Sequence, residues 1–85
     1  MNEIDFRLGA VDIVRDYIRV HLDAADRNVE YTIFVVWMCK ILNHNKALLS
    51  TTLPDGMYYE VTYNGDNRCY YLDAYKKFDN IRVSA

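Results

Sequence analysis

The sequence is poor in the two residues that most often interrupt regular structure. It has one proline, Pro54, and three isolated glycines, Gly9, Gly56 and Gly65. Isolated glycines cannot form a Gly-rich phosphate loop, so the common nucleotide-binding motifs are excluded. Long apolar runs are also missing, and none reaches the roughly 18 residues that a membrane-spanning helix needs. We therefore expect neither a phosphate-binding loop nor a membrane span.

An excess of charge of either sign is also lacking. Ten Lys and Arg residues stand against twelve Asp and Glu residues, which leaves a net charge of −2. There is no basic run to neutralise phosphates, so we expect no direct nucleic-acid binding. No spacing singles out a catalytic carboxylate pair, and Ser50 and Ser84 lie in no nucleophile-elbow context. The sequence therefore predicts a protein that is not an enzyme.

Cysteine is scarce, with only Cys39 and Cys69. The first residues lack the basic and then apolar order of a secretion signal, so we expect a cytoplasmic protein with free thiols or metal ligands rather than a disulfide. Together with His21 and His44, the cysteines are the only Cys and His residues, and zinc takes four such ligands. Their spacing matches no recognised motif. The pattern therefore favours a buried Cys39 and no cofactor, with a zinc site as the alternative.

The composition indicates a small globular protein. The chain has 85 residues, of which 52% are hydrophobic and 14% aromatic. A chain of this length has room for one core, so residues 1–85 are expected to form a single domain.

The first segment has the period of an amphipathic helix. Asn2 can cap its start, and DAADRN (residues 23–28) is typical of a polar exit loop. Gly9 within this segment indicates either a loose helix end or close packing. The apolar residues step by three or four and are predicted to share the buried face: Ile4, Leu8, Val11, Val14, Ile18 and Leu22.

The hydrophobic period changes at residue 31. YTIFVVWMCKIL (residues 31–42) is apolar on both parities and rich in β-branched and aromatic residues. This favours a long central strand, with a buried helix as the alternative. In this strand, Trp37 is expected to share a face with Ile33 and Val35, opposite to Phe34 and Met38.

Three further strands are predicted, at residues 46–53, 57–63 and 68–72. Residues 43–45 form the first turn. The second is Pro54-Asp55-Gly56, in which Pro presets φ, Asp bonds back to the backbone and Gly accepts a positive φ. Asn64-Gly65 is a strong hairpin signal. Residues 73–79 fit either a short helix or a continued strand. The expected fold is α+β, with an N-terminal helix packed on a four-stranded antiparallel β-meander and a short C-terminal helix as an option.

Tyrosine is abundant where the strands are predicted. Six of the eight tyrosines lie within residues 53–78. Tyr59 and Tyr63 are expected on the sheet face that meets the helix, and Tyr75 in packing. Tyr58 falls on the opposite face, where either Tyr70 or Tyr71 must join it. An uncovered face bearing tyrosine is typical of a protein-binding surface or a homodimer interface, because Tyr gives a large contact area at low entropic cost.

Several stretches resemble a family of small phage and prophage proteins from viruses of Gram-positive bacteria. They are VW-x-CK, KALLSTT, DGMYYEVTYNGD and YLDAYKKF, and the resemblance covers about residues 31–83. The family has no established catalytic residues, so the resemblance assigns none. Cys39 lies within a shared stretch, whereas Cys69 does not.

The resemblance implies a setting in which small phage proteins bind and disable a host factor. Type II anti-CRISPR proteins, which block Cas9, are examples. We therefore expect a phage-encoded inhibitor of a bacterial defence protein, most plausibly a Cas9 effector. Its predicted contact residues are Tyr58, Tyr70 and Tyr71 with the hairpin-tip acids Asp55 and Asp66. A protein that binds host replication or transcription machinery, or a small metal- or nucleotide-binding domain, is the alternative.

Overall fold

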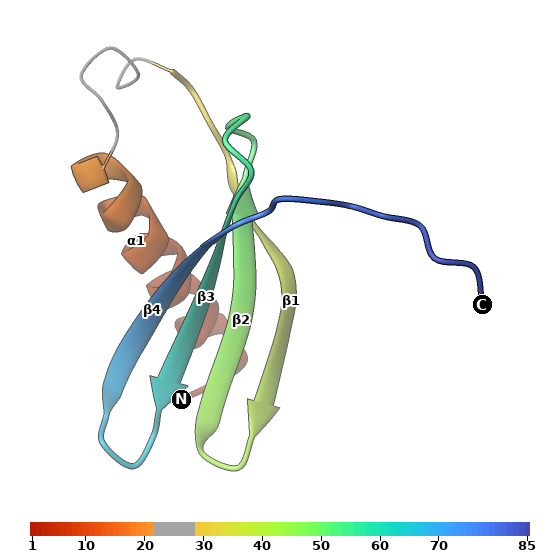
Figure 1. Cartoon of the computed structure of the whole chain (residues 1–85). Helices are drawn as coiled ribbons and strands as arrows, with labels where there is room; N and C mark the ends of the chain where they lie inside the picture. The colour runs from red at the N-terminus through yellow and green to blue at the C-terminus, as the bar shows by residue number, and fades with distance from the viewer. Residues whose placement is uncertain (22–28) are drawn as a thin grey trace.

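The computed structural model describes residues 1–21 and 29–85, which form one helix and one sheet in two layers. Helix α1 (Glu3–His21) lies across one face of a sheet formed by β1 (Ile33–Ile41), β2 (His44–Thr51), β3 (Met57–Asn64) and β4 (Cys69–Lys76). The other face of the sheet carries no second layer in this part of the chain (Figure 1). The predicted α+β architecture is confirmed.

The sheet is an antiparallel meander with the strand order β1-β2-β3-β4. Each strand pairs with its neighbour in sequence, because the connections between them are short turns. β1 and β4 are therefore the two edge strands. The prediction that residues 31–42 form a central strand was wrong in this respect, since this apolar strand lies at an edge.

Helix α1 begins at a capping residue, as predicted. The Asn2 side-chain oxygen accepts a hydrogen bond from the backbone N–H of Asp5 at 2.8 Å, which satisfies one of the donors left free at a helix start. Ion pairs of 3.0 and 3.1 Å, Asp12–Arg15 and Asp16–Arg19, lie on its exposed side.

The buried face of α1 differs from the predicted one. The fully buried residues are Phe6, Ala10, Val14 and Ile18. Ile4 and Leu8 are exposed by 71% and 61%, so their placement on the core face was wrong. The predicted stripe continued at Leu22, and that residue and the 23–28 loop lie outside the described residues. Phe6 and Ala10 were missed because Ala is a weak hydrophobic marker and Phe6, two residues from both Ile4 and Leu8, falls outside the chosen stripe.

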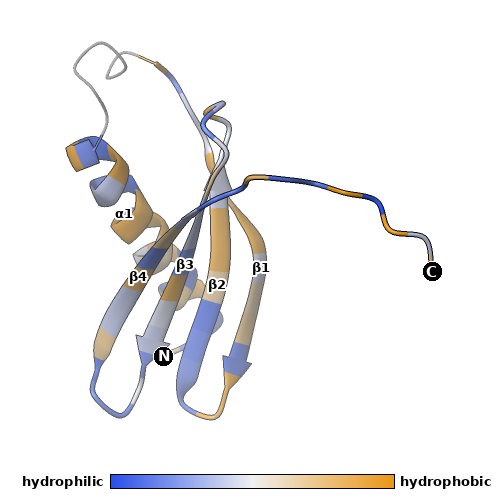
Figure 2. Ribbon diagram, viewed as in Figure 1, coloured by the Kyte–Doolittle hydropathy of each residue, from blue (hydrophilic) through white to orange (hydrophobic). Residues whose placement is uncertain are grey.

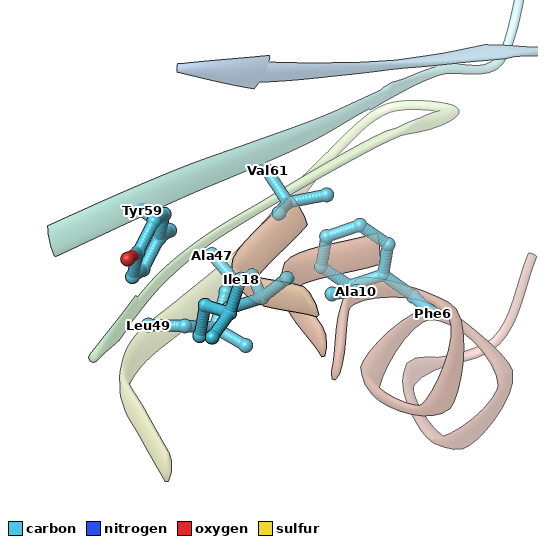
Figure 3. Close-up of a cluster of buried hydrophobic side chains, with 8 residues drawn as sticks. Phe6, Ala10, Ile18, Ala47, Leu49, Tyr59 and Val61 are labelled. Atoms are coloured by element: carbon cyan, nitrogen blue, oxygen red, sulfur yellow. The ribbon is translucent and has the colours of Figure 1, made fainter. Parts of the chain in front are cut away.

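The core forms where this helix face meets the central strands. Phe6, Ala10, Val14 and Ile18 pack against buried side chains of β2 and β3. Figure 3 shows the two sets pointing toward each other. The strand residues are Ala47 and Leu49 of β2 and Tyr59 and Val61 of β3. Gly9 packs closely, because a Cβ there would lie 2.8 Å from the Tyr70 hydroxyl oxygen.

A β-bulge interrupts β1. Val35 pairs with Leu49 and Trp37 pairs with Leu48, which leaves Val36 without a partner residue of its own. One extra residue reverses the alternation of the side chains beyond it. Met38 therefore packs with Ile33 and Val35 on the helix side, and Trp37 faces away. The prediction that Trp37 shares a face with Ile33 and Val35 was wrong for this reason.

The turns follow their local signals closely. Gly56 adopts a φ of 68°, and the Asp55 carboxylate accepts a hydrogen bond from the Met57 N–H at 3.1 Å, as predicted. The first turn lies at Leu42 and Asn43 rather than at residues 43–45, and Leu42 has a φ of 55°. The Asn64 side chain accepts bonds from two backbone N–H groups of the last hairpin loop.

The end of the chain does not form the optional C-terminal helix. β4 continues to Lys76, and residues 77–85 have neither helix nor strand. This final segment extends away from the sheet, and apolar residues interrupt its polar ones (Figures 1 and 2). Within the described part of the chain, no helix is long and apolar enough to cross a membrane.

Candidate functional site

The candidate site is the sheet face that points away from α1. The strand register determines which side chains share it. Tyr59 and Val61 of β3 are buried against the helix, so Tyr58 and Glu60 face the other way. Across the sheet, Tyr58 pairs with Tyr75, and Thr62 pairs with Tyr71. We call the large side chains of this face the outer patch: Phe34, Trp37, Leu48, Tyr58, Tyr71 and Tyr75.

The outer patch crosses all four strands. Trp37 of β1 pairs with Leu48 of β2, while Tyr58 and Tyr75 supply the rings of β3 and β4. A shallow depression is lined by these four side chains together with Glu60, Lys76 and Lys77. Trp37, Tyr71 and Tyr75 are exposed by 43%, 53% and 51%. A continuous apolar surface rimmed by polar groups is typical of an interaction site.

An ion pair lies on this face of the sheet. Lys46 lies 3.3 Å from the Glu60 carboxylate across the β2–β3 pair. Both side chains are partly exposed, so the pair contributes at most about 1 kcal/mol to stability. Lys76 and Lys77 also border the depression, so the rim of the outer patch carries charges of both signs.

Tyr71, and not Tyr70, joins Tyr58 on the outer patch. Interaction with the Cys69 side chain raises the pKa of the Tyr71 phenol above its ordinary value. Tyr70 lies on the helix side, where its ring centroid is 6.4 Å from that of Phe6 and 5.0 Å from that of Tyr63. Burial raises the pKa of Tyr70. Its prediction as a contact residue is therefore corrected, since its ring packs on α1.

Three members of the outer patch were missed by the sequence interpretation. Phe34 was placed only by strand alternation, Trp37 was placed on the same face as Ile33 and Val35, and Tyr75 was assigned to core and sheet packing. Each error has a local cause. The bulge at Val36 reverses the side of Trp37, and the continuation of β4 to Lys76 turns Tyr75 outward. Residues 31–42 are apolar at both odd and even positions, so their pattern does not indicate where a bulge lies.

Asp55 and Asp66 form parts of turns and lie at opposite ends of β3. Asp55 bonds the backbone of its own turn. Asp66 accepts a hydrogen bond from the Asn43 amide at 2.6 Å, and its other oxygen lies 3.6 Å from His44 Nε2. They therefore do not act together beside the outer patch, and we assign them to holding the turns.

The four candidate metal ligands do not meet. His21 ends α1, where its Nδ1 lies 2.8 Å from the Tyr17 carbonyl oxygen. His44 Nδ1 accepts a hydrogen bond from the Gly65 N–H at 3.2 Å. Cys39 and Cys69 are free thiols on the two edge strands, and Cys39 is exposed rather than buried as predicted. Among residues 1–21 and 29–85, no three His, Cys, Asp or Glu side chains come together in a metal-binding arrangement.

Comparison with known proteins places the chain in a family. Searches of curated proteins and of solved structures found no match. A family model matches residues 9–85, which include most of α1 and all four strands. The chain therefore belongs to the DUF6275 family, a family of unknown function.

Proposed function

We propose that this protein is a non-enzymatic binding module that covers a surface of another protein with its outer patch. The observation that carries the proposal is the exposure of Trp37, Tyr71 and Tyr75 on a sheet face that no second layer covers among residues 1–21 and 29–85. Tyr and Trp are the residues that most often dominate the binding energy of protein interfaces.

The sheet presents these rings in a fixed arrangement. Tyr58, Tyr71 and Tyr75 stand on two hydrogen-bonded strands. Tyr59 and Val61 of β3 are buried in the core, and Tyr70 and Leu72 of β4 are partly buried against it. Binding then orders only side chains, which reduces its entropic cost. A rigid patch of this kind supports inhibition by occlusion, in which the protein binds a target in one-to-one ratio and blocks access.

For the target, we propose a bacterial defence effector of the Cas9 type, with this protein encoded by a phage. The support is the resemblance of residues 31–83 to small phage proteins, together with a compact domain that carries a binding surface. The target is an inference by analogy with anti-CRISPR proteins, whereas the binding surface is inferred from the geometry of the sheet.

The proposed target is tested by a DNA-cleavage assay with Cas9 from a Gram-positive host. The purified protein is added either before or after the target DNA. We expect inhibition, and dependence on the order of addition would identify DNA loading as the blocked step. Unimpaired cleavage in both orders would overturn the Cas9 proposal.

A pull-down from host lysate would then separate this target from replication or transcription machinery. The bait is the intact protein, and the matched control bait carries Tyr58→Ala and Tyr71→Ala. A polymerase or replication subunit retained by the intact bait alone would support the other class of host target. A protein retained equally by both baits would not bind through the outer patch.

A further inference from the structure

The C-terminal segment, residues 77–85, leaves three apolar side chains almost fully exposed. Phe78 is exposed by 89%, Ile81 by 74% and Val83 by 84%. The segment starts at a defined point, because the Lys77 N–H donates a hydrogen bond of 2.8 Å to the Gly56 carbonyl oxygen. Beyond that point it extends away from the sheet (Figure 1). Three exposed apolar residues in an extended segment are typical of a strand that pairs elsewhere.

The edge strand β1 offers the complementary surface. It is apolar at every position except Lys40, and its outer edge has no strand partner among the described residues. Natural edge strands usually carry several charges or a proline to prevent pairing with other chains. β4, the other edge strand, carries Asp73 and Lys76. β1 is thus the less protected edge of the sheet.

A groove runs between this edge and α1. Its helix wall consists of Glu3, Arg7 and Val11, and its sheet wall consists of residues 33–38. Val11 and the half-buried residues of β1 form an apolar floor that continues into the core. A strand added to β1 would place every second side chain in this groove and the others beside Phe34 on the outer face.

The C-terminal segment has the matching alternation. In an extended chain, Asp79, Ile81 and Val83 point to one side, and Phe78 and Arg82 point to the other. Ile81 and Val83 suit the apolar floor, and Asp79 suits Arg7 on the helix wall. Phe78 then lies near the exposed ring of Phe34. The apolar residues and the charged residue of the segment therefore fit the groove in the same strand register.

Within one chain, Asp79 cannot reach Arg7. From Lys77 to Asp79 the chain spans at most about 7 Å. β1 lies three strands away from β4, a distance of about 14 Å at ordinary strand spacing. Asp79 of one copy therefore reaches Arg7 only in another copy. Mutual exchange closes a symmetric dimer in which each copy gives and receives one segment.

We propose that residues 78–83 of one copy add as a strand to β1 of a second copy, and that this exchange forms a homodimer. The partner is a second copy of this chain. The proposal does not depend on the Cas9 target, because it uses the edge of β1 and not the Tyr58, Tyr71 and Tyr75 part of the outer patch.

Sedimentation equilibrium of the full chain tests the proposal. We expect a dimer, and we expect Ile81→Asp with Val83→Asp to raise the dissociation constant at least about tenfold, because two apolar side chains leave their pocket. The control, Asn80→Asp with Ser84→Asp, adds the same charge outside the groove and should leave the dimer intact. Both variants should remain folded and unfold cooperatively on heating, since all four side chains are exposed in the single copy.

A charge exchange tests the register. Asp79→Arg should weaken the dimer through repulsion by Arg7, and adding Arg7→Asp should restore it. A full chain that remains monomeric up to about 1 mM would overturn the proposal. So would a dimer that survives Ile81→Asp with Val83→Asp, because another surface would then hold it. Failure of Arg7→Asp to restore the dimer would overturn the pairing of Asp79 with Arg7.

Discussion

At the scale of single residues, the tyrosines divide into two structural classes. Tyr59 and Tyr70 pack toward α1, where Tyr59 is exposed by only 3%. Tyr58, Tyr71 and Tyr75 lie on the open face of the sheet. The alternation of β3 was correctly predicted from the sequence, because Tyr58 and Tyr59 are adjacent in a strand and must point to opposite faces.

Tyr59 makes the unfolding free energy of the protein decrease at alkaline pH. Burial raises its pKa from 10.0 to about 12, with further increases from Asp55 and Tyr17. In the unfolded chain, the Tyr59 phenol ionises near its ordinary pKa of 10.0. The stabilising effect of Tyr59 is therefore complete below pH 10.0 and is lost as the pH rises toward about 12. We predict that Tyr59→Phe reduces the loss of unfolding free energy between about pH 9 and about pH 11.5.

Urea unfolding at the two pH values measures this effect. Tyr75→Phe serves as the control, because its ring is half exposed. If the two variants lose stability equally with rising pH, Tyr59 is not the residue responsible.

Gly65 is required by close packing between two hairpins. A Cβ at Gly65 would overlap the carbonyl oxygen of Asn43, which is backbone and cannot rotate away. We predict that Gly65→Ala costs about 2 to 3 kcal/mol of unfolding free energy. Gly56→Ala should cost about 1 kcal/mol, because it meets a positive φ of 68° but only an ordinary contact with Lys77.

Denaturant unfolding of the two variants ranks these costs. A Gly65→Ala protein that is as stable as the Gly56→Ala protein would show that the hairpins do not pack as described. The hairpin itself was predicted from Asn64-Gly65, but its contact with Asn43 was not, since that contact joins turns distant in sequence.

At the scale of elements, α1 was predicted correctly as a helix but with its buried face rotated. The periodicity allows two stripes, one through Ile4 and Leu8 and one through Phe6 and Ala10. Both stripes include Val14 and Ile18, so the pattern alone does not decide between them. The structure selects the second, in which small Ala10 is fully buried in the core and the ring of Phe6 stacks with that of Tyr70.

This choice of face gives a direct prediction. Phe6→Ala should cost about 3 to 5 kcal/mol, because a fully buried ring leaves a cavity. Leu8→Ala should change stability by about 0.5 kcal/mol or less, since Leu8 is mostly exposed. Thermal unfolding of both variants checks the ranking. A larger loss for Leu8→Ala would favour the other face.

The bulge in β1 determines which large side chains reach the outer face. Deletion of Val36 removes the extra residue and leaves Val35 and Trp37 on their present sides. We therefore predict a folded protein whose stability changes by about 1 kcal/mol or less. Deletion of Met38 would instead reverse the residues around it and should cost about 3 kcal/mol or more.

The fluorescence of Trp37, the only tryptophan, reports the outcome. Its emission and its quenching by acrylamide should be unchanged when Val36 is deleted. A shift toward a buried signal would contradict the position of the bulge. No local feature of the sequence revealed the bulge, because its cost and benefit depend on packing against both α1 and β2.

At the scale of the whole molecule, the two-layer architecture leaves one sheet face without a second layer in the described part of the chain. The number and order of the strands were predicted from turn signals, and with one helix and four strands one open face is the expected result. The composition of that face was predicted only in part. Tyr58 and Tyr71 were anticipated, whereas Trp37 and Tyr75 depended on the bulge and on the length of β4.

The central claim is that the outer patch binds the target. The measurement that tests it most directly is the inhibition of Cas9 cleavage by the intact protein and by the variant Tyr58→Ala with Tyr71→Ala. Leu8→Ala with Val20→Ala is the matched control, since both residues are exposed and apolar on α1. We predict that the outer-patch variant needs about 30-fold more protein for the same inhibition, as expected for loss of interface tyrosines. The control should match the intact protein, and full inhibition by a folded outer-patch variant would contradict the claim.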